Sequence, residues 1–262
     1  MTITAYARTV DIGDGVAPTP VARITSTSRR PRLWFSGFGP FRAVVDGTPV
    51  PLPPITRTVL VRLVLARGGL VDADDLYRDS WPDPAPALRR EQRVAVHKRI
   101  AELRRCLAPG QIDDSTSVLL TERSARTGYR LLLEGDQVDL HIFADRVFRA
   151  AAVRDAVAVD LLVQALAMWT ERPLLGLPDK AFVRDHGSRL TKLRDRACRE
   201  LAAGCRELGR TRDALAAFDR LQAKHPDDIG LRDLIEQLGD DPQPVTAIAL
   251  HRQPYDSAYR RR

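Results

Sequence analysis

Seven cationic side chains gather in one short segment, and their chemistry is that of nucleic-acid binding. Residues 88–107 contain seven Arg or Lys residues against only two acids, Glu91 and Glu102. Both cation types neutralise phosphates, and arginine can donate two hydrogen bonds to O6 and N7 of guanine. The segment therefore predicts a DNA-binding helix; the alternative is a solvated helix face with Glu–Arg pairs. The cations are Arg89, Arg90, Arg93, Lys98, Arg99, Arg104 and Arg105.

An apolar stripe runs through the same segment. Its members are spaced by four, three and four residues, as on one face of an α-helix over about 87–107. They are Val96, Ile100, Leu103 and Leu107. We expect the stripe to pack on its own domain, so that Arg90, Arg93 and His97 project outwards with further cations.

The first half of the chain predicts a small α+β unit over roughly 32–135. Asp46 and Gly47 stand between short apolar stretches, which indicates a two-residue hairpin turn because both residues tolerate positive φ. The polar connector between the last two strands carries Arg123 and Arg126. Helices are predicted over 55–67, 73–80 (capped by Asp72) and 87–107, and strands over 118–120 and 129–132. A short helix, a turn and a long helix follow the order of a helix-turn-helix.

The second half predicts an all-α domain over 136–239, because the pattern is helical almost throughout from Asp139. Several of its small and aromatic residues match the offsets of a tetratricopeptide repeat, in which small residues let paired helices approach. They are Ala202, Gly209, Ala214, Phe218 and Pro226. The alternative is an ordinary αα-hairpin rich in Ala and Leu. We expect residues 1–31 to form a disordered leader and residues 240–262 a flexible Pro- and Arg-containing tail.

The charge is distributed unevenly between the two halves. The whole chain has a formal net charge of +7, and residues 1–135 hold 20 cations and 14 acids. The remaining residues hold 21 cations and 20 acids. A basic domain beside a near-neutral one predicts a polyanion partner for the basic domain, and an arginine-rich solvated surface is the alternative.

Other function classes find no support in the motifs. The sequence contains no GxSxG, P-loop, HExxH or EF-hand pattern, and its five histidines are isolated from one another. We therefore expect no enzymatic activity, no cofactor and no metal site. Three scattered cysteines are too few for a disulfide framework, which fits a reducing cytoplasm. No apolar run reaches the length of a membrane span, so no membrane partner is expected.

Two sets of motifs carry a family resemblance over about residues 32–238. LVDADDLYRDSW, RVAVHKRIAELRRCL and TGYRLLL resemble the winged-helix DNA-binding domain of the OmpR type, with Val94 counted among the core positions of the long helix. VDLHIFADRV, ALAMWTERPLLGL and residues 182–226 resemble the bacterial transcriptional activation domain. The pairing of the two resembles the Streptomyces antibiotic regulatory protein (SARP) family.

The resemblance implies a fold and a set of DNA contacts. The fold is an α+β winged helix-turn-helix domain followed by an all-α tetratricopeptide-like domain, with the long helix in the major groove and the wing on the adjacent minor groove or backbone. Arg93, His97 and Arg99 would contact bases or the groove, with Lys98 on the same helix. Arg89, Arg90, Arg104 and Arg105 would mainly contact phosphates. Arg123 and Arg126 would be wing contacts, and Tyr129 would be structural.

The resemblance also implies a function. It is that of a cytoplasmic activator of a secondary-metabolite (antibiotic) gene cluster, which binds double-stranded DNA as side-by-side protomers on tandem direct repeats near the −35 element. RNA polymerase, including its sigma factor, would be the protein partner. The alternatives are a repressor or activation-deficient regulator, since the helical domain ends early near Leu238, and a helical-repeat adaptor that binds protein.

Overall fold

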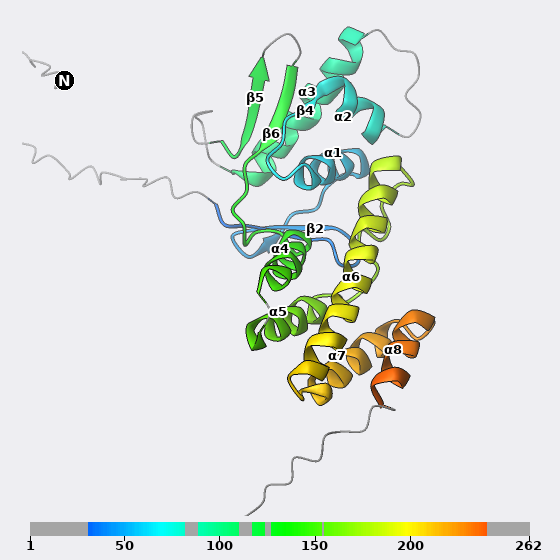
Figure 1. Ribbon diagram of the computed structural model, residues 1–262. Coiled ribbons are helices and arrows are strands. Elements are labelled where there is room, and N and C mark those ends of the chain that lie inside the picture. Colours follow the sequence, from blue (N-terminus) through cyan, green and yellow to red (C-terminus); the bar gives the residue numbers. More distant parts are fainter. Residues whose placement is uncertain (1–30, 82–88, 110–116, 124–126, 154, 240–262) are drawn as a thin grey trace, which may run out of the picture.

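The computed structural model describes residues 31–81, 89–109, 117–123, 127–153 and 155–239. The expected tail, the expected leader except Pro31, and the expected helix start near Ala87 lie outside these residues. Within them the chain folds as an α+β winged helix-turn-helix unit followed by an all-α unit (Figure 1). The predicted fold class is therefore confirmed.

A three-stranded antiparallel sheet opens the fold. Asp46 and Gly47 have φ angles of 49° and 82°, so both turn residues adopt the left-handed conformation that a tight hairpin needs. Val45 pairs directly with Thr48 across this turn, which confirms the predicted hairpin. The strands are β1 (Leu33–Ser36), β2 (Arg42–Val45) and β3 (Thr48–Pro49).

Three helices follow and pack on one another. The first ends at Leu65, slightly before the predicted end, because Arg67 and Gly68 adopt left-handed φ angles of 50° and 77° that no helix can continue. The second is capped as predicted, since the Asp72 side chain accepts a hydrogen bond of 2.8 Å from the N–H of Asp74. The helices are α1 (Pro54–Leu65), α2 (Ala73–Ser80) and α3 (Arg89–Leu107).

The wing is a second antiparallel sheet in the order β4-β6-β5. Its hairpin strands run further into the polar connector than predicted, because the ladder continues through Glu122 opposite Gly128 and Arg123 opposite Thr127. These polar residues belong to the strands because they pair across the hairpin, and the periodicity of a single strand does not reveal such pairing. The strands are β4 (Val71–Asp72), β5 (Leu119–Arg123) and β6 (Thr127–Leu131).

The helical half of the described chain contains α4 (Asp139–Ala152), α5 (Ala156–Ala167), α6 (Ala181–Glu207), α7 (Thr211–Lys224) and α8 (Ile229–Gly239). Ala202 on α6 and Ala214 and Phe218 on α7 are all buried, as the tetratricopeptide-like offsets require. Gly209 ends α6 with a left-handed φ of 65°. Helix α6 is the longest, and its first turns lie beside the winged-helix unit (Figure 1).

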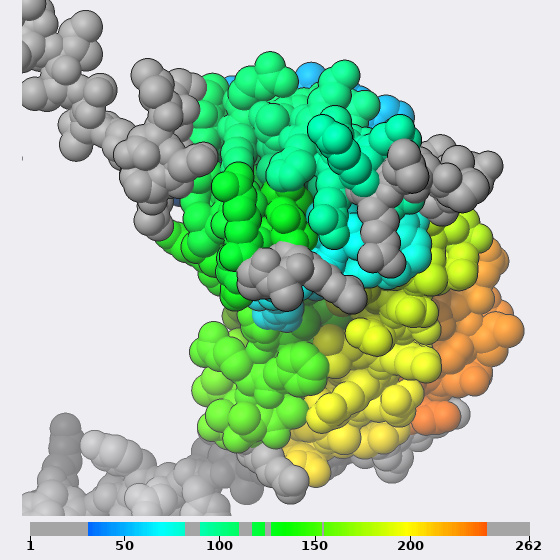
Figure 2. Space-filling view, turned by 90° about the horizontal axis from the view of Figure 1, so that it is seen from above, coloured from blue at the N-terminus to red at the C-terminus, as the bar shows by residue number. Residues whose placement is uncertain are grey.

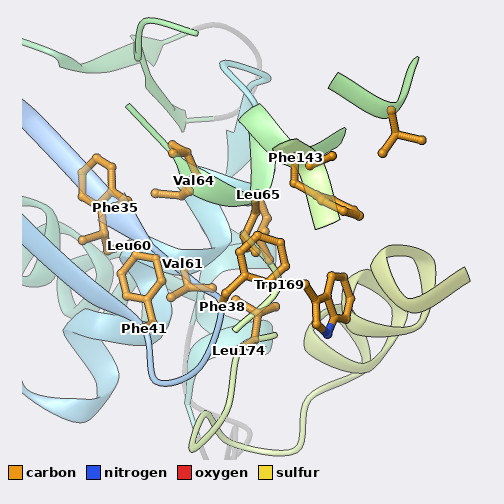
Figure 3. Packing of buried hydrophobic residues seen from close by; sticks show 14 of the residues in the cluster. Phe35, Phe38, Phe41, Leu60, Val61, Val64, Leu65, Phe143, Trp169 and Leu174 are labelled. Carbon is orange, nitrogen blue, oxygen red and sulfur yellow. The ribbon is translucent and has the colours of Figure 1, made fainter. Parts of the chain in front are cut away.

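One hydrophobic core crosses from the first sheet into the helical half. The ring of Phe38 lies 5.5 Å from that of Phe143 on α4 and 5.0 Å from that of Trp169 after α5 (Figure 3). Isolated β-bridges join Phe35 to Val138 and Phe38 to Pro173 along the same boundary. The first sheet is therefore packed between α1 and the helical half, and all three contribute to this one core.

A buried carboxylate fastens this junction. Asp139, 7% exposed, accepts hydrogen bonds from the backbone N–H groups of Gly37 at 2.8 Å, Phe38 at 3.3 Å and Leu140 at 2.6 Å. Burial raises the pKa of this carboxyl, while the N–H donors act in the opposite direction. A Cβ atom at Gly37 would lie 2.6 Å from Cδ1 of Leu140, so a larger residue here would force the buried Leu140 side chain to move.

The same junction buries a histidine. His141 on α4 is 9% exposed, and its pKa is lowered from 6.5 to about 4, first by burial and then by the nearby charge of Arg67. The folded protein therefore holds this imidazole neutral over a pH range in which the unfolded chain takes up a proton.

We predict that His141 makes the fold sensitive to acid. The free energy of unfolding should decrease as the pH falls from about 6.5 to 4, by up to about 3 kcal/mol from this residue. His141→Gln, which does not titrate, should show a shallower decrease across the same window, measured by urea unfolding at each pH. Equal pH slopes for the two proteins would contradict the prediction.

Candidate nucleic-acid interface

Helix α3 turns one face to the core and the other to solvent. The predicted stripe of Val96, Ile100, Leu103 and Leu107 is at most 1% exposed, which confirms the helix phase. The solvent face consists of Arg90, Glu91, Val94, His97, Lys98, Ala101 and Arg105. The expectation that Val94 is a core position is wrong. Val94 lies two residues before Val96 and is therefore rotated from it by about 200° around the helix.

The solvent face presents cations that are available to phosphates. Within the described part of the chain, the exposed side chains of Arg90 and Lys98 have no hydrogen-bond or ion-pair partner. Arg105 is also exposed and bonds only to the Ala101 carbonyl of its own helix, at 3.4 Å. Helix α3 and the β5–β6 hairpin lie on one side of the molecule, and α6 and α8 lie on the other (Figure 2).

Two of the expected base-contacting arginines are paired with carboxylates. Nε of Arg93 lies 3.4 Å from Oδ1 of Asp74 on α2, and Nη1 of Arg99 lies 3.0 Å from Oε2 of Glu102. The same Glu102 oxygen accepts a 2.8 Å hydrogen bond from Thr56 on α1. Both arginines thus flank the exposed face rather than project from its centre.

Two further side chains connect α3 to the wing. The Arg104 guanidinium donates to the Leu119 carbonyl, at 2.9 and 3.1 Å, and to the Thr121 hydroxyl at 2.7 Å. Nδ1 of His97 lies 2.8 Å from the hydroxyl of Tyr129, which is fully buried on β6. Burial also raises the pKa of this phenol. Helix α3 and the wing are therefore held in a fixed relative position.

These placements bear on the remaining expected contacts. The inward orientation of Arg104 favours a structural role over the expected phosphate contact. Arg123 stands exposed at the end of β5, where a wing contact is expected. Arg126 and the side chain of Arg89 lie outside the described residues, so those two contacts stay predictions.

In the wing, Arg130 makes tertiary hydrogen bonds that the sequence does not predict. Arg130 on β6 bonds to Glu122 at 2.7 Å and to the carbonyl of Gly68 at 3.0 Å. Its partners lie 8 and 62 residues away, so no local pattern could have found this contact.

Comparison with known proteins identifies the helical half. Residues 138–237 match the family model of the bacterial transcriptional activator domain. The chain contains a bacterial transcriptional activator domain. This confirms the resemblance on which the sequence-based interpretation rests.

Two curated relatives are regulators from Mycobacterium tuberculosis (strain ATCC 25618 / H37Rv). The transcriptional regulatory protein EmbR is 32% identical over 203 residues, which are 74% of this chain and 50% of EmbR. The transcriptional regulatory protein MoaR1 is 34% identical over 199 residues, which are 73% of this chain and 61% of MoaR1. This chain thus spans about half to three fifths of the length of these relatives.

A solved structure shows the same architecture. Mycobacterium tuberculosis EmbR, in complex with a low-affinity phosphopeptide, matches with a TM-score of 0.54 and 27% identity, over 79% of this chain and 65% of that one. None of the helices in the described ranges combines the length and the apolar composition of a membrane span. No cluster of three or more His, Cys, Asp or Glu side chains in the same ranges is arranged to hold a metal ion.

We predict that Arg104 and its neighbour Arg105 differ in their effect on stability. Arg104→Met should lower the free energy of unfolding by about 1–3 kcal/mol, because three hydrogen bonds from a charged donor to β5 are lost. Arg105→Met removes the same charge from the solvent face and should change it by no more than about 0.5 kcal/mol. Urea unfolding of both variants measures the difference. Equal stabilities would show that the contacts with β5 do not hold the helix.

Proposed function

We propose that this chain is a cytoplasmic, sequence-specific DNA-binding transcriptional regulator. The observation that carries the proposal is the solvent face of α3, on which the cations of Arg90, Lys98 and Arg105 are exposed. A helix of this kind fits the major groove of B-DNA, and its cations neutralise the flanking phosphates. The homology to EmbR and MoaR1, both transcriptional regulatory proteins, supports the same function.

We assign roles to the individual side chains on this basis. Arg90, Lys98 and Arg105 contact phosphates, together with Arg89. Arg93, His97 and Arg99 contact bases or the groove edge, the two arginines after leaving their carboxylate partners, and Arg123 and Arg126 contact DNA from the wing. No catalytic step and no cofactor enters this function.

The helical half, in the same proposal, makes the regulator an activator. Protomers lie side by side on tandem direct repeats near the −35 element, and the helical domain contacts RNA polymerase, including its sigma factor. The target is a secondary-metabolite (antibiotic) gene cluster. The match of residues 138–237 to the activator domain supports this part.

Two alternatives have different outcomes in experiment. A repressor or an activation-deficient regulator would bind the same DNA without raising transcription. A helical-repeat adaptor would bind protein and not DNA, and the unpaired cations on the α3 solvent face are the observation against it.

We predict salt-dependent binding to duplex DNA from the promoters neighbouring the gene for this chain. Several neutralised phosphates should make log K fall with log salt concentration with a slope of several units. Lys98→Ala should reduce the slope by about 1, because one phosphate contact is lost. Lys192→Ala, an exposed lysine on α6, is the matched control and should leave the slope unchanged. A slope near zero, or no binding to any of these duplexes, would refute DNA binding.

We predict that the full chain raises transcription by purified RNA polymerase holoenzyme from a promoter on which it gives a footprint. The full chain is needed because the core crosses between the two halves, and a cut near Glu134 would expose Phe38. The measurement is the amount of transcript at saturating protein. Less transcript from occupied DNA would establish the repressor alternative, and an unchanged amount would establish the activation-deficient one.

A further inference from the structure

A valine occupies the middle of the cationic face of α3. Val94 is 62% exposed, and among the exposed large apolar side chains of the described residues only Ile229 on α8 is more so, at 68%. Residues three and four positions apart are neighbours on a helix surface. Val94 is therefore surrounded by exposed residues at those spacings, which are Arg90, Glu91, His97 and Lys98. Arg90 and Lys98 are cations and Glu91 is the one acid among the four.

The core does not explain this valine. The stripe of α3 that packs inwards is complete without it, since Val96, Ile100, Leu103 and Leu107 fill that face. A branched apolar side chain within a cationic patch is also a poor match for a second copy of the same face, because the cations would repel each other. The partner of this surface must combine negative charge with a small apolar group.

Duplex DNA presents that combination in its major groove. Its phosphates carry the charge, and the C5-methyl of thymine is the apolar group on the base-pair edges. A valine that faces cytosine or guanine would cover polar groups without bonding to them, which costs affinity. We propose that Val94 contacts a thymine methyl when α3 lies in the major groove, and so selects a T·A pair at that position. The inference rests on the proposed DNA-binding function and adds a base-reading residue to it.

The test removes the methyl group from the DNA and the side chain from the protein, separately and together. Replacing one thymine of the footprinted site by deoxyuridine deletes the C5-methyl and keeps the hydrogen-bonding groups. For the native chain, one thymine position should lose about fourfold in affinity, as expected for one buried methyl-sized group. Val94→Ala should bind the thymine site more weakly by a similar factor, and should show no further loss on the deoxyuridine site.

Two controls distinguish a thymine contact from a general loss of affinity or of stability. Val157→Ala shortens an exposed valine on α5, and this variant should keep the full sensitivity to deoxyuridine. Thermal unfolding should show that Val94→Ala is as stable as the native chain, since its side chain is exposed. If Val94→Ala stays as sensitive as the native chain to every thymine replacement, or weakens all duplexes equally, Val94 does not read thymine while DNA binding stands. If the native chain binds no duplex, the proposed function and this inference fail together.

Discussion

The buried carboxylate of Asp139 is the contact on which the arrangement of the two halves depends. It accepts N–H groups from Gly37 and Phe38, which lie more than 100 residues earlier in the chain. Burying a charged carboxylate costs free energy, and hydrogen bonds from several N–H donors offset this cost only while those donors remain in place. The carboxylate therefore fixes β1 on the first turn of α4, and through β1 it places α1 against the helical half.

Contacts further from the junction reinforce this placement. The Lys180 ammonium, before the first turn of α6, donates to the carbonyl of Trp81, where α2 ends. The guanidinium of Arg62 on α1 lies 5.7 Å from the ring centroid of Phe182 on α6. The activator domain thus touches the helix-turn-helix at its turn as well as at the first sheet. On the proposed function, a polymerase bound to the helical half is held at a fixed distance from the DNA under α3.

Sequence patterns predicted the helices, strands and turns well, but they predicted the tertiary partners of the side chains poorly. The spacing of Val96 and Ile100 gave the correct inward face of α3, and Asp46 and Asp72 marked the hairpin and the cap, because each signal is confined to a few residues. The carboxylate partner of Arg93 and the carbonyl partner of Arg104 depend on tertiary packing, which no helical period encodes. Val94 is exposed although the family motif includes it among the core positions, because its angle on the helix differs by about 200° from that of Val96.

The pairing of Arg93 and Arg99 with carboxylates also bears on how a cationic helix can be specific. Exposed ion pairs contribute about 0–1 kcal/mol, whereas a bidentate arginine–guanine contact contributes about 1–3 kcal/mol of discrimination. On non-cognate DNA, an arginine that exchanges Asp74 or Glu102 for a mismatched base gains no binding free energy, so the ion pairs persist. On a cognate guanine the exchange is favourable. In the proposed complex, the unpaired Arg90 and Lys98 supply binding to any duplex, and the paired arginines respond only to the correct base.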